Sequence, residues 1–235
     1  MSMTLRIAIV GYGKMGRMIE RLAPEHDCEV VRRIRSAENG NGDSLTRAAL
    51  NGVDVAIEFT TPAAAAHNLC RLIEAGIPVV TGTTGWFAAL LEIRKLAEAK
   101  NAGVVWGPNF SVGLHHFRKT VAEAARRFAR EESYGAWGWE IHHAAKKDAP
   151  SGTLLALAED MASSGYTRPV SLSANRAGAM PGTHEIGFDS AEDTITIRHT
   201  ARSREGFARG ALRAARWLVP KKGFFEFREI ADDLP

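Results

Sequence analysis

The sequence of 235 residues has only two cysteines and no long apolar run. Cys28 and Cys70 lie far apart without a C-x-x-C pattern, which excludes a disulfide framework and argues against a zinc site. We expect two free thiols in a reducing compartment. No run approaches the roughly 20 apolar residues that cross a bilayer, and the short apolar run ending at Gly11 lacks the features of a signal peptide. These absences predict a soluble, cytoplasmic protein that does not bind membranes.

An excess of one charge is also missing. The chain has 30 basic and 27 acidic residues, and its net charge is +3. Before the C-terminal third only Arg32, Arg33 and Arg35 form a tight basic cluster, whereas nucleic-acid binders gather many such residues on one face. We therefore expect no nucleic-acid partner, and a slightly basic surface suits an anionic small molecule.

In the first half, apolar β-forming runs alternate with helical patterns. Strands are predicted at 5–10, 29–34, 53–60, 77–85 and 103–111, and helices from Met15, at 62–75 and at 90–100, with a loop over 36–44. Such alternation is typical of a parallel sheet with helices on both faces. Residues 1–110 are therefore predicted to form a Rossmann-type dinucleotide-binding domain.

The second half has a different pattern. An amphipathic helix at 113–130 precedes a strand at 137–143 and a helix near 152–164, and the chain then becomes rich in strands. Residues 193–200 alternate threonine and arginine with Ile195, Ile197 and His199, which predicts one wet and one packed face. The overall prediction is an α/β protein with a smaller α+β domain over 111–204, built on a mixed or antiparallel sheet. The last helix and tail, about 205–235, are expected to return to the first domain.

The segment GYGKMG at 11–16 matches G-x-G-x-x-G between a strand and a helix. Glycines allow a sharp turn and a close approach to a pyrophosphate, and the helix start supplies free N–H groups. The pattern alone is weak, because any tight turn can use glycine, but its position after the first strand favours a dinucleotide.

The end of the second predicted strand usually carries an acid that binds the adenosine ribose. Here Arg32 and Arg33 stand in that region instead. Two guanidinium groups suit the 2′-phosphate of NADPH. The alternative is that they are solvated side chains at a strand end.

The segment EIHHAAKKDAPSGT at 140–153 concentrates the groups that can carry chemistry. Ser151 is predicted to cap the following helix, which would leave the N–H groups of Gly152 and Thr153 free for a carboxylate. Lys146 can add a positive charge, and His142 and His143 can exchange protons near neutral pH.

Other interpretations of this segment remain open. The paired histidines could bind a metal, but Lys146 would repel a cation and no further ligands complete the set, so we expect no metal. They could also lie in a surface loop. Ser151 could be a nucleophile, although G-x-S-x-G is missing. A second pair, His115 and His116, begins a helix and is expected to serve packing.

With this segment the chain resembles the 4-hydroxy-tetrahydrodipicolinate reductase (dihydrodipicolinate reductase) family. The resemblance continues in EFTTP at 58–62, GTTG at 82–85, PNFSVG at 108–113, RAGAMPGTH at 176–184 and SREGFARGA at 203–211. It implies His142 as the catalytic acid with Lys146 as its cationic partner, and His143, Gly152, Thr153 and Arg176 as substrate contacts. It also implies cofactor contacts at Gly11, Tyr12, Gly13, Lys14, Met15, Gly16, Phe59, Gly82, Thr83, Thr84, Gly107, Pro108, Asn109 and Phe110, besides Arg32 and Arg33.

The resemblance further implies a reaction and an assembly. Members of this family reduce a cyclic unsaturated dicarboxylate with NADPH or NADH and release water, in lysine and diaminopimelate biosynthesis, and they form homotetramers through the second domain. A dehydrogenase acting on another amino or imino acid is the alternative enzyme, and a non-catalytic nucleotide sensor is the alternative of another class. Neither has a need for the segment around His142 and Lys146.

Overall fold

The chain is described as a computed structural model that covers residues 4–40 and 42–235. It divides into two compact units. Unit 1 contains Met1–Ser111 and Glu205–Pro235, and unit 2 contains Val112–Arg204. Unit 2 is therefore an insertion within the sequence of unit 1. Among the described residues, none of the helices combines the length and the apolar character that crossing a membrane requires.

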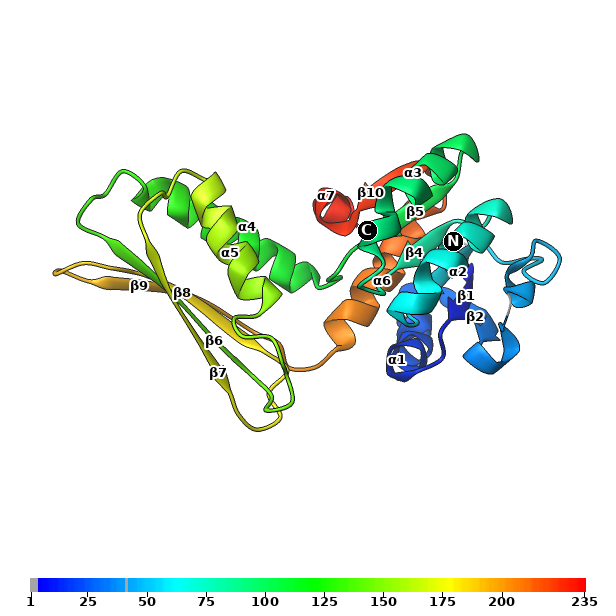
Figure 1. Cartoon of the computed structure of the whole chain (residues 1–235), viewed down its shortest axis with the longest axis horizontal. Helices are drawn as coiled ribbons and strands as arrows, with labels where there is room; N and C mark the ends of the chain where they lie inside the picture. The colour runs from blue at the N-terminus through cyan, green and yellow to red at the C-terminus, as the bar shows by residue number, and fades with distance from the viewer. Residues whose placement is uncertain (1–3, 41) are drawn as a thin grey trace. The chain divides into compact units, whose positions relative to one another are not determined.

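Unit 1 is built on a six-stranded sheet in which every pairing is parallel. Its strands are β1 (Leu5–Val10), β2 (Cys28–Ile34), β3 (Val55–Glu58), β4 (Val79–Thr81), β5 (Gly103–Trp106) and β10 (Gly223–Glu226). Their order is β10-β5-β4-β3-β1-β2, so the chain runs from β1 outward to β2 and then back across to β5 (Figure 1). The reversal beside β1 is where open α/β sheets bind their ligands.

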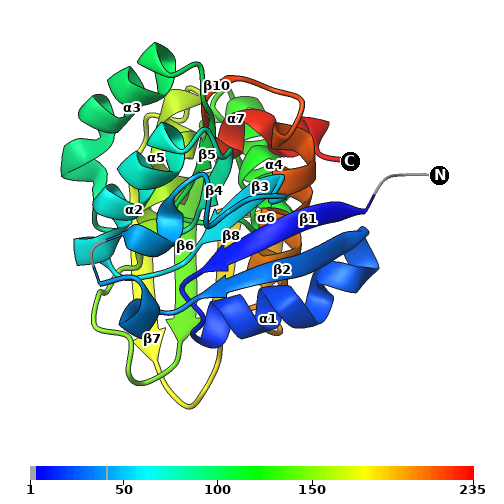
Figure 2. The same cartoon turned by 90° about the vertical axis from the view of Figure 1, so that its right-hand side faces the viewer.

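Helices cover both faces of this sheet (Figure 2). They are α1 (Lys14–Leu22), α2 (Pro62–Glu74), α3 (Leu90–Ala99), α6 (Glu205–Leu218) and the short α7 (Phe227–Ile230). Helices α1 and α6 pack together on one face, and α2 and α3 pack together on the other. The central strands are fully buried between these layers, which confirms the predicted Rossmann-type architecture.

Some element bounds differ from the prediction. The strand expected over 103–111 ends at Trp106, because Gly107 and Pro108 follow and proline cannot donate to a sheet. The segment 36–44, expected as loop, includes two single-turn 3-10 helices, Ser36–Glu38 and Asp43–Leu45. The edge strand β10 was not predicted, since its four residues are too few to show a period.

Unit 2 combines a four-stranded mixed sheet with two helices. The elements are α4 (Val112–Phe128), β6 (Gly135–His142), α5 (Gly152–Ser163), β7 (Val170–Arg176), β8 (Thr183–Asp189) and β9 (Thr194–Thr200). The strand order is β7-β6-β8-β9, with β6 and β7 parallel and the other pairs antiparallel. Apolar residues of α4 and α5, such as Phe117 and Leu157, form a core with Ile186 and Phe188 of β8. The predicted α+β architecture with a mixed sheet is confirmed.

Strand β9 shows the expected alternation, but its packed face is incomplete. Ile197 and His199 are half-buried, and the His199 ring stacks on Phe117 at 5.6 Å. Ile195 is 41% exposed, contrary to the prediction, because β9 is the edge strand of the sheet.

The sheet face opposite α4 and α5 is rich in aromatic and polar side chains. Trp137, Trp139 and Ile141 of β6 alternate with the residues that face the helices, and all three are half-buried. Trp139 donates to Asn175 at 2.7 Å, and Arg198 lies over its ring at 5.9 Å. In the described part of unit 2, both helices lie on the other face of the sheet.

Candidate active site

The glycine turn after β1 brings two backbone segments too close for side chains. Gly11 has a φ of 94°, and a Cβ there would lie 2.0 Å from the carbonyl oxygen of Phe59. A Cβ at Gly16 would lie 2.3 Å from the carbonyl oxygen of Gly11. Gly13, the N-cap of α1, has open space around its Cα and provides no side-chain cap. The N–H groups that begin α1 can therefore bind a pyrophosphate, which fits a dinucleotide.

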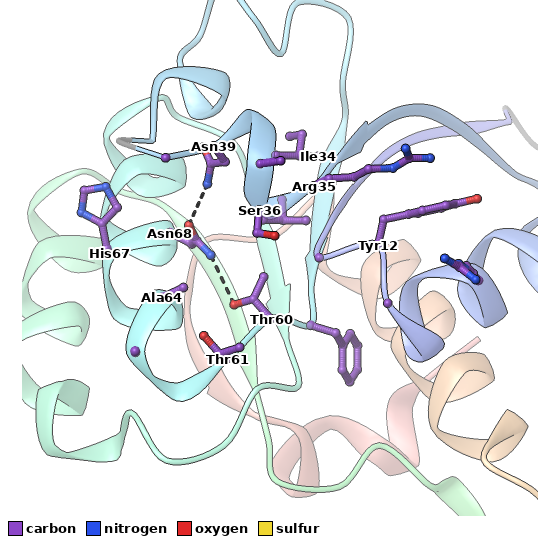
Figure 3. A pocket seen from close by; sticks show the side chains of 18 residues that line it. Tyr12, Ile34, Arg35, Ser36, Asn39, Thr60, Thr61, Ala64, His67 and Asn68 are labelled. Atoms are coloured by element: carbon purple, nitrogen blue, oxygen red, sulfur yellow. Dashed lines mark hydrogen bonds between the residues drawn. The ribbon is translucent and has the colours of Figure 1, made fainter.

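Two pockets adjoin this turn. The larger, about 1100 Å³, extends from Gly11 and Tyr12 to the residues after β2 and the start of α2 (Figure 3). The smaller, about 320 Å³, is lined by Gly13, Lys14, Met15, Phe59 and the segment Gly82–Thr84, among others. Phe59 lines both. Two pockets on either side of a helix start fit the two nucleosides of a dinucleotide joined by their pyrophosphate.

The larger pocket is organised by a hydrogen-bond network (Figure 3). The Asn39 side chain donates to Asn68 at 3.1 Å, and Asn68 donates to Thr60 at 3.3 Å. Thr60 in turn donates to Glu58, a fully buried carboxylate that also accepts from Thr81 at 2.6 Å. Asn39 and Asn68 were not predicted from the sequence, since isolated amides form no recognisable motif.

At the end of β2 the pocket is lined by Arg35 and Ser36, and Arg17 also lines it. The guanidinium groups of Arg35 and Arg17 lie 5.2 and 5.9 Å from the centre of the Tyr12 ring. Over residues 4–40 and 42–235 neither group forms an ion pair. A carboxylate side chain is missing from the lining of this pocket, so two cations stand there without an acidic neighbour in the lining.

The predicted residues Arg32 and Arg33 do not line either pocket. Arg33 is paired with Glu20 of α1, and Arg32 donates to the carbonyl oxygens of Val31 and Ala49. Strand β2 continues to Ile34, so the first arginine beyond the strand end is Arg35. The basic cluster is correctly located in sequence, but the residue in the pocket is its last member.

The other predicted cofactor residues divide into two groups. Thr83 accepts from the backbone N–H of Thr60 at 2.8 Å, and a Cβ at Gly82 would lie 2.1 Å from the Phe59 ring, so this turn packs tightly under Phe59. By contrast, Gly16 and the segment 107–110 line neither pocket. Phe110 is buried and packs against the rings of Phe59 and Phe227.

In unit 2, the start of α5 already holds a carboxylate. Ser151 is confirmed as the N-cap, because its hydroxyl accepts from the N–H of Leu154 at 3.2 Å. Lys146 donates to both carboxylate oxygens of Asp148, at 2.7 and 2.8 Å. This bond and, to a smaller extent, the backbone N–H of Gly152 lower the pKa of Asp148. The ammonium group and the helix start therefore act together on an anion.

Beneath the helix start lies a buried cluster around Glu140. Its carboxylate is fully buried and accepts from the N–H of Ser151 and from the guanidinium group of Arg176, each at 2.8 Å. The Ser151 hydroxyl also donates to it. Its second oxygen lies 3.6 Å from Nδ1 of His142 and 3.3 Å from Nε2 of His184. Neither Glu140 nor His184 was predicted from the sequence to have a role.

The register of the sheet explains this convergence. Glu140 is the cross-strand partner of His184, and His142 is the partner of Arg176. Residues two apart in a strand share a face, so Glu140 and His142 both lie on the face that packs against α5. Gly182 ends the turn before β8 with a φ of 146°, and a Cβ there would lie 2.7 Å from Nε2 of His142. The glycine therefore leaves room beside that nitrogen.

Charge and burial set the protonation of the cluster. Burial acts to raise the pKa of Glu140, but the hydrogen bonds from Ser151 and Arg176 hold it below its usual value. Burial lowers the pKa of His142, and Glu140 opposes that shift. For His184, burial and the nearby His142 lower the pKa to about 4. Glu140 is therefore ionised and His184 neutral at neutral pH.

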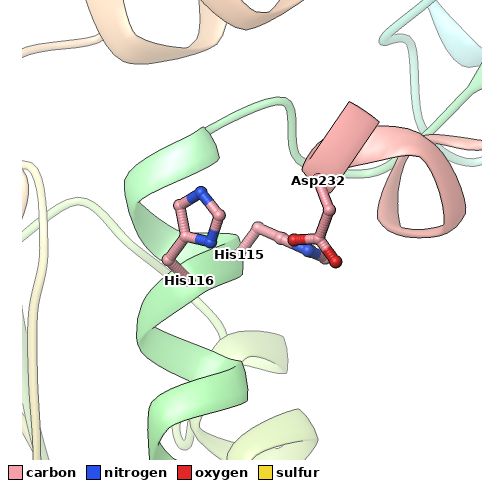
Figure 4. Close-up of side chains that lie close together, drawn as sticks. All are labelled: His115, His116 and Asp232. Carbon is pink, nitrogen blue, oxygen red and sulfur yellow. The ribbon is translucent and has the colours of Figure 1, made fainter. Parts of the chain in front are cut away.

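The remaining histidines near the predicted site are placed differently. His143 is half-buried, and its backbone N–H donates to Met180 at 2.9 Å. His115 and His116 lie on the first turns of α4 with their rings 5.5 Å apart (Figure 4). His116 is exposed, so the packing expected of this pair is wrong for it. The buried stripe of α4 is formed by Leu114, Phe117, Val121 and Ala125 instead.

Glu140, His142 and His184 are close enough to hold a metal ion. However, Glu140 already accepts from Ser151 and Arg176, and the Arg176 guanidinium would repel a cation. The cluster is thus better suited to holding protons than a metal.

The sequence matches the family models described as "Dihydrodipicolinate reductase, N-terminus" over residues 5–110 and "Dihydrodipicolinate reductase, C-terminus" over 113–230. It is 33% identical to the 4-hydroxy-tetrahydrodipicolinate reductase of Christiangramia forsetii, over 98% of this chain and 99% of that protein. It is 34% identical to the enzyme of that name from Desulfovibrio desulfuricans, over 94% and 96%. The fold is similar to a dipicolinate-bound dihydrodipicolinate reductase from Paenisporosarcina sp. TG-14, with a TM-score of 0.80 and 23% identity over 97% of this chain and all of that one. The chain belongs to the dihydrodipicolinate reductase family.

Proposed function

We propose that this protein reduces 4-hydroxy-tetrahydrodipicolinate to tetrahydrodipicolinate with loss of water, in lysine and diaminopimelate biosynthesis, using NADPH or NADH. The observation that carries the proposal is the carboxylate of Asp148, which Lys146 binds through both oxygens just before the start of α5, in the same unit as a buried histidine. The substrate has two carboxylates, and here an internal one shows how such a group can be bound.

In the proposed mechanism, loss of the 4-hydroxyl as water leaves a double bond between ring carbons 3 and 4, and NADPH or NADH, held by the residues of unit 1, would supply a hydride to carbon 4. Electron density then develops on the neighbouring ring carbon, and protonated His142 donates a proton there. Lys146, Arg176, His143 and the N–H groups of Gly152 and Thr153 neutralise the carboxylates and orient the ring. Orientation of this kind can contribute several kcal/mol to the rate.

In unit 1, we propose that the glycine turn and the start of α1 bind the pyrophosphate, and that Phe59 and Gly82–Thr84 contact the nicotinamide half. Gly16 and residues 107–110 would then act by supporting this turn. Arg35, with Ser36 and Arg17, is proposed to bind the 2′-phosphate, since these residues line the pocket and a carboxylate side chain is missing there. NADPH is accordingly the preferred cofactor.

A coupled assay tests the function. The dihydrodipicolinate synthase product is supplied in situ, and NADPH oxidation is followed beside a panel of amino, imino and keto acids. Turnover with the synthase product alone supports the proposal. Turnover with another acid would favour the alternative dehydrogenase, and NADPH binding without any turnover would favour a nucleotide sensor.

We also propose that unit 2 builds a homotetramer through the sheet face that carries Trp137, Trp139 and Ile141. A sheet face with aromatic side chains that the helices of its own unit leave uncovered is commonly covered by a second copy. Light scattering at micromolar protein should give about four times the 25.5 kDa of one chain, and Trp139→Asp should lower that mass. A wild-type mass near 25.5 kDa would exclude the assembly, and twice that mass would retain the sheet interface but remove a second one. We place the protein in the cytoplasm, consistent with its two free cysteines.

A further inference from the structure

We propose that Glu140 and His184 are positioning residues. Together they hold the proton donor His142, the start of α5 and Arg176 in fixed positions relative to one another. This inference rests on the proposed function, because it assigns these residues to that reaction. It concerns side chains that touch neither substrate nor cofactor and act through their neighbours.

The first argument is the convergence of hydrogen bonds on one carboxylate. The Oε1 atom of Glu140 accepts from the Ser151 N–H and from Arg176, so it ties the start of α5 to the end of β7. Removing a carboxylate from water costs several kcal/mol unless donors replace the water. Glu140 is 0% exposed, and its donors belong to the same elements that are proposed to bind the substrate. Its burial is therefore compensated by the elements that it aligns.

The other carboxylate oxygen of Glu140, Oε2, lies beside two histidines. Oε2 of Glu140 accepts from the Ser151 hydroxyl and lies between two imidazoles, whose ring centres are 5.0 Å apart at an angle of 74°. Nδ1 of His142, 3.6 Å away, has no hydrogen-bond partner in the described structure. It can donate to Glu140 once protonated. The carboxylate thus fixes the edge of the ring opposite to Nε2, the nitrogen beside Gly182.

Charged neighbours of both signs act on the pKa of His142. Lys146 and Arg176 lower its pKa, whereas Glu140 and, to a smaller extent, Asp148 raise it. His184 on β8 and His199 on β9 complete the titratable groups of the cluster. Asp148 is largely exposed and engaged with Lys146, so Glu140 is the buried negative charge that opposes the lowering of the His142 pKa.

His184 has a different task in this arrangement. With a pKa of about 4 it is neutral in the working range, so it can donate one hydrogen from Nε2 to Glu140 without adding a charge. A positive residue in its place would compete with His142 for the carboxylate. A neutral donor completes the hydrogen bonds of Glu140 and leaves its charge available to His142.

Glu140→Gln is the direct test, because it removes the charge and nearly keeps the volume. A proton donor must be protonated, so kcat/KM falls as pH rises through the pKa of His142. Without the Glu140 charge, this fall should move to lower pH by about 1 unit. KM for the dicarboxylate should rise about 10-fold as Ser151 and Arg176 lose their anchor, and NADPH affinity should stay unchanged. Glu140→Asp should restore the position of the fall in large part.

The matched control is Asp160→Asn, which neutralises another carboxylate of unit 2, one that is paired with Arg118 at 2.6 Å and belongs to neither site. It should leave both the pH of the fall and KM for the dicarboxylate unchanged. A loss of rate in Glu140→Gln that is equal at every pH, with KM unchanged, would overturn the proposal and leave Glu140 a purely structural residue. The same conclusion would follow if the control shifted the profile equally.

A measurement on the wild-type protein covers the case in which the Glu140 variant does not fold. Imidazole ¹⁵N shifts report both the protonation and the tautomer of a histidine. His184 should remain neutral with its hydrogen on Nε2 to below about pH 5. Protonation of His184 near its ordinary pKa, or a hydrogen on Nδ1, would overturn its role. These shifts need no turnover, so failure of the proposed reaction and failure of this inference give different results.

Discussion

The two candidate sites are built from different kinds of chemical group. In unit 1 the centre of the site consists of backbone groups at Gly11 and Gly13, where no side chain covers the backbone, and neutral amide side chains line the pocket. In unit 2 it is made of buried ionisable side chains around Glu140. The first type of site responds to added volume and is insensitive to pH. The second responds to the loss or gain of a charge, because ionisable groups in a poorly solvated setting depend on one another.

His142→Gln is expected to distinguish most clearly between the contribution of unit 2 to turnover and the contribution of unit 1 to cofactor binding. It removes the proton donor without touching unit 1, so kcat should fall by about 10²–10⁴ while NADPH affinity stays unchanged. Steady-state kinetics and cofactor titration provide the two readings. His199→Gln, which changes a half-buried histidine of the same unit, should keep kcat near the wild-type value. Normal turnover by the His142 variant would remove it from the mechanism.

Gly13→Ala tests the opposite site by volume alone. The protein leaves open space around this residue, so an added methyl group meets no atom within 4 Å and the fold should tolerate it. The methyl group would obstruct the approach of the pyrophosphate to the start of α1, and Kd for NADPH should rise about 10- to 100-fold. Calorimetry should show an unchanged Tm. Gly135→Ala is the control on unit 2, and if it weakened NADPH equally, the assignment of the turn would fail.

Arg35→Ala tests a charge of the unit 1 pocket. It should weaken NADPH about 10-fold and NADH very little, because only NADPH carries the 2′-phosphate. The control is Arg33→Ala, since Arg33 is paired with Glu20 outside the pocket. Titrations with both cofactors decide the question. If Arg33 or Arg32 proved to be the selective residue, Arg35 would be surface charge.

The smallest expected effect is on stability. His142, His184 and His199 all have lowered pKa values, chiefly because they are buried. In the unfolded chain they titrate near pH 6.5. Above that pH these histidines do not change the free energy of unfolding with pH. Below it, the unfolded state binds protons that the folded state does not. The free energy of unfolding should therefore decrease on acidification.

The corresponding measurement is Tm from about pH 7.5 to about pH 5.5, where we expect a decrease of a few degrees. His199→Gln removes one of the four histidines whose pKa is lowered by burial, the fourth being His26, and should make the decrease smaller. A Tm that is constant or rises over this range would show that these histidines titrate normally in the folded protein.

Sequence periodicity predicted the architecture well, because most strands and helices of both units carry a strong pattern. It was less accurate for single side chains: β2 ends at Ile34 as predicted, but Arg32 and Arg33 lie within the strand, and Arg35, the first arginine after it, lines the pocket. The glycine turn and the segment around Ser151 could be recognised because their chemistry is local. Glu140 and His184 could not be joined, since they are far apart in the sequence and only the register of β6 with β8 makes them neighbours.

The insertion of unit 2 between β5 and α6 also affects how the chain reaches its native state. Strand β10 pairs with β5, and α6 contacts β3, β4 and β5, so unit 1 is closed by its most C-terminal residues. During synthesis, the ribosome must add all of Val112–Arg204 before those elements exist, which takes on the order of 5–20 s. For that interval the β5 edge is unpaired and one sheet face is uncovered. The uncovered sheet edge and face of the nascent chain are surfaces of the kind that chaperones bind. They are covered only when the last 31 residues, Glu205–Pro235, have been synthesised.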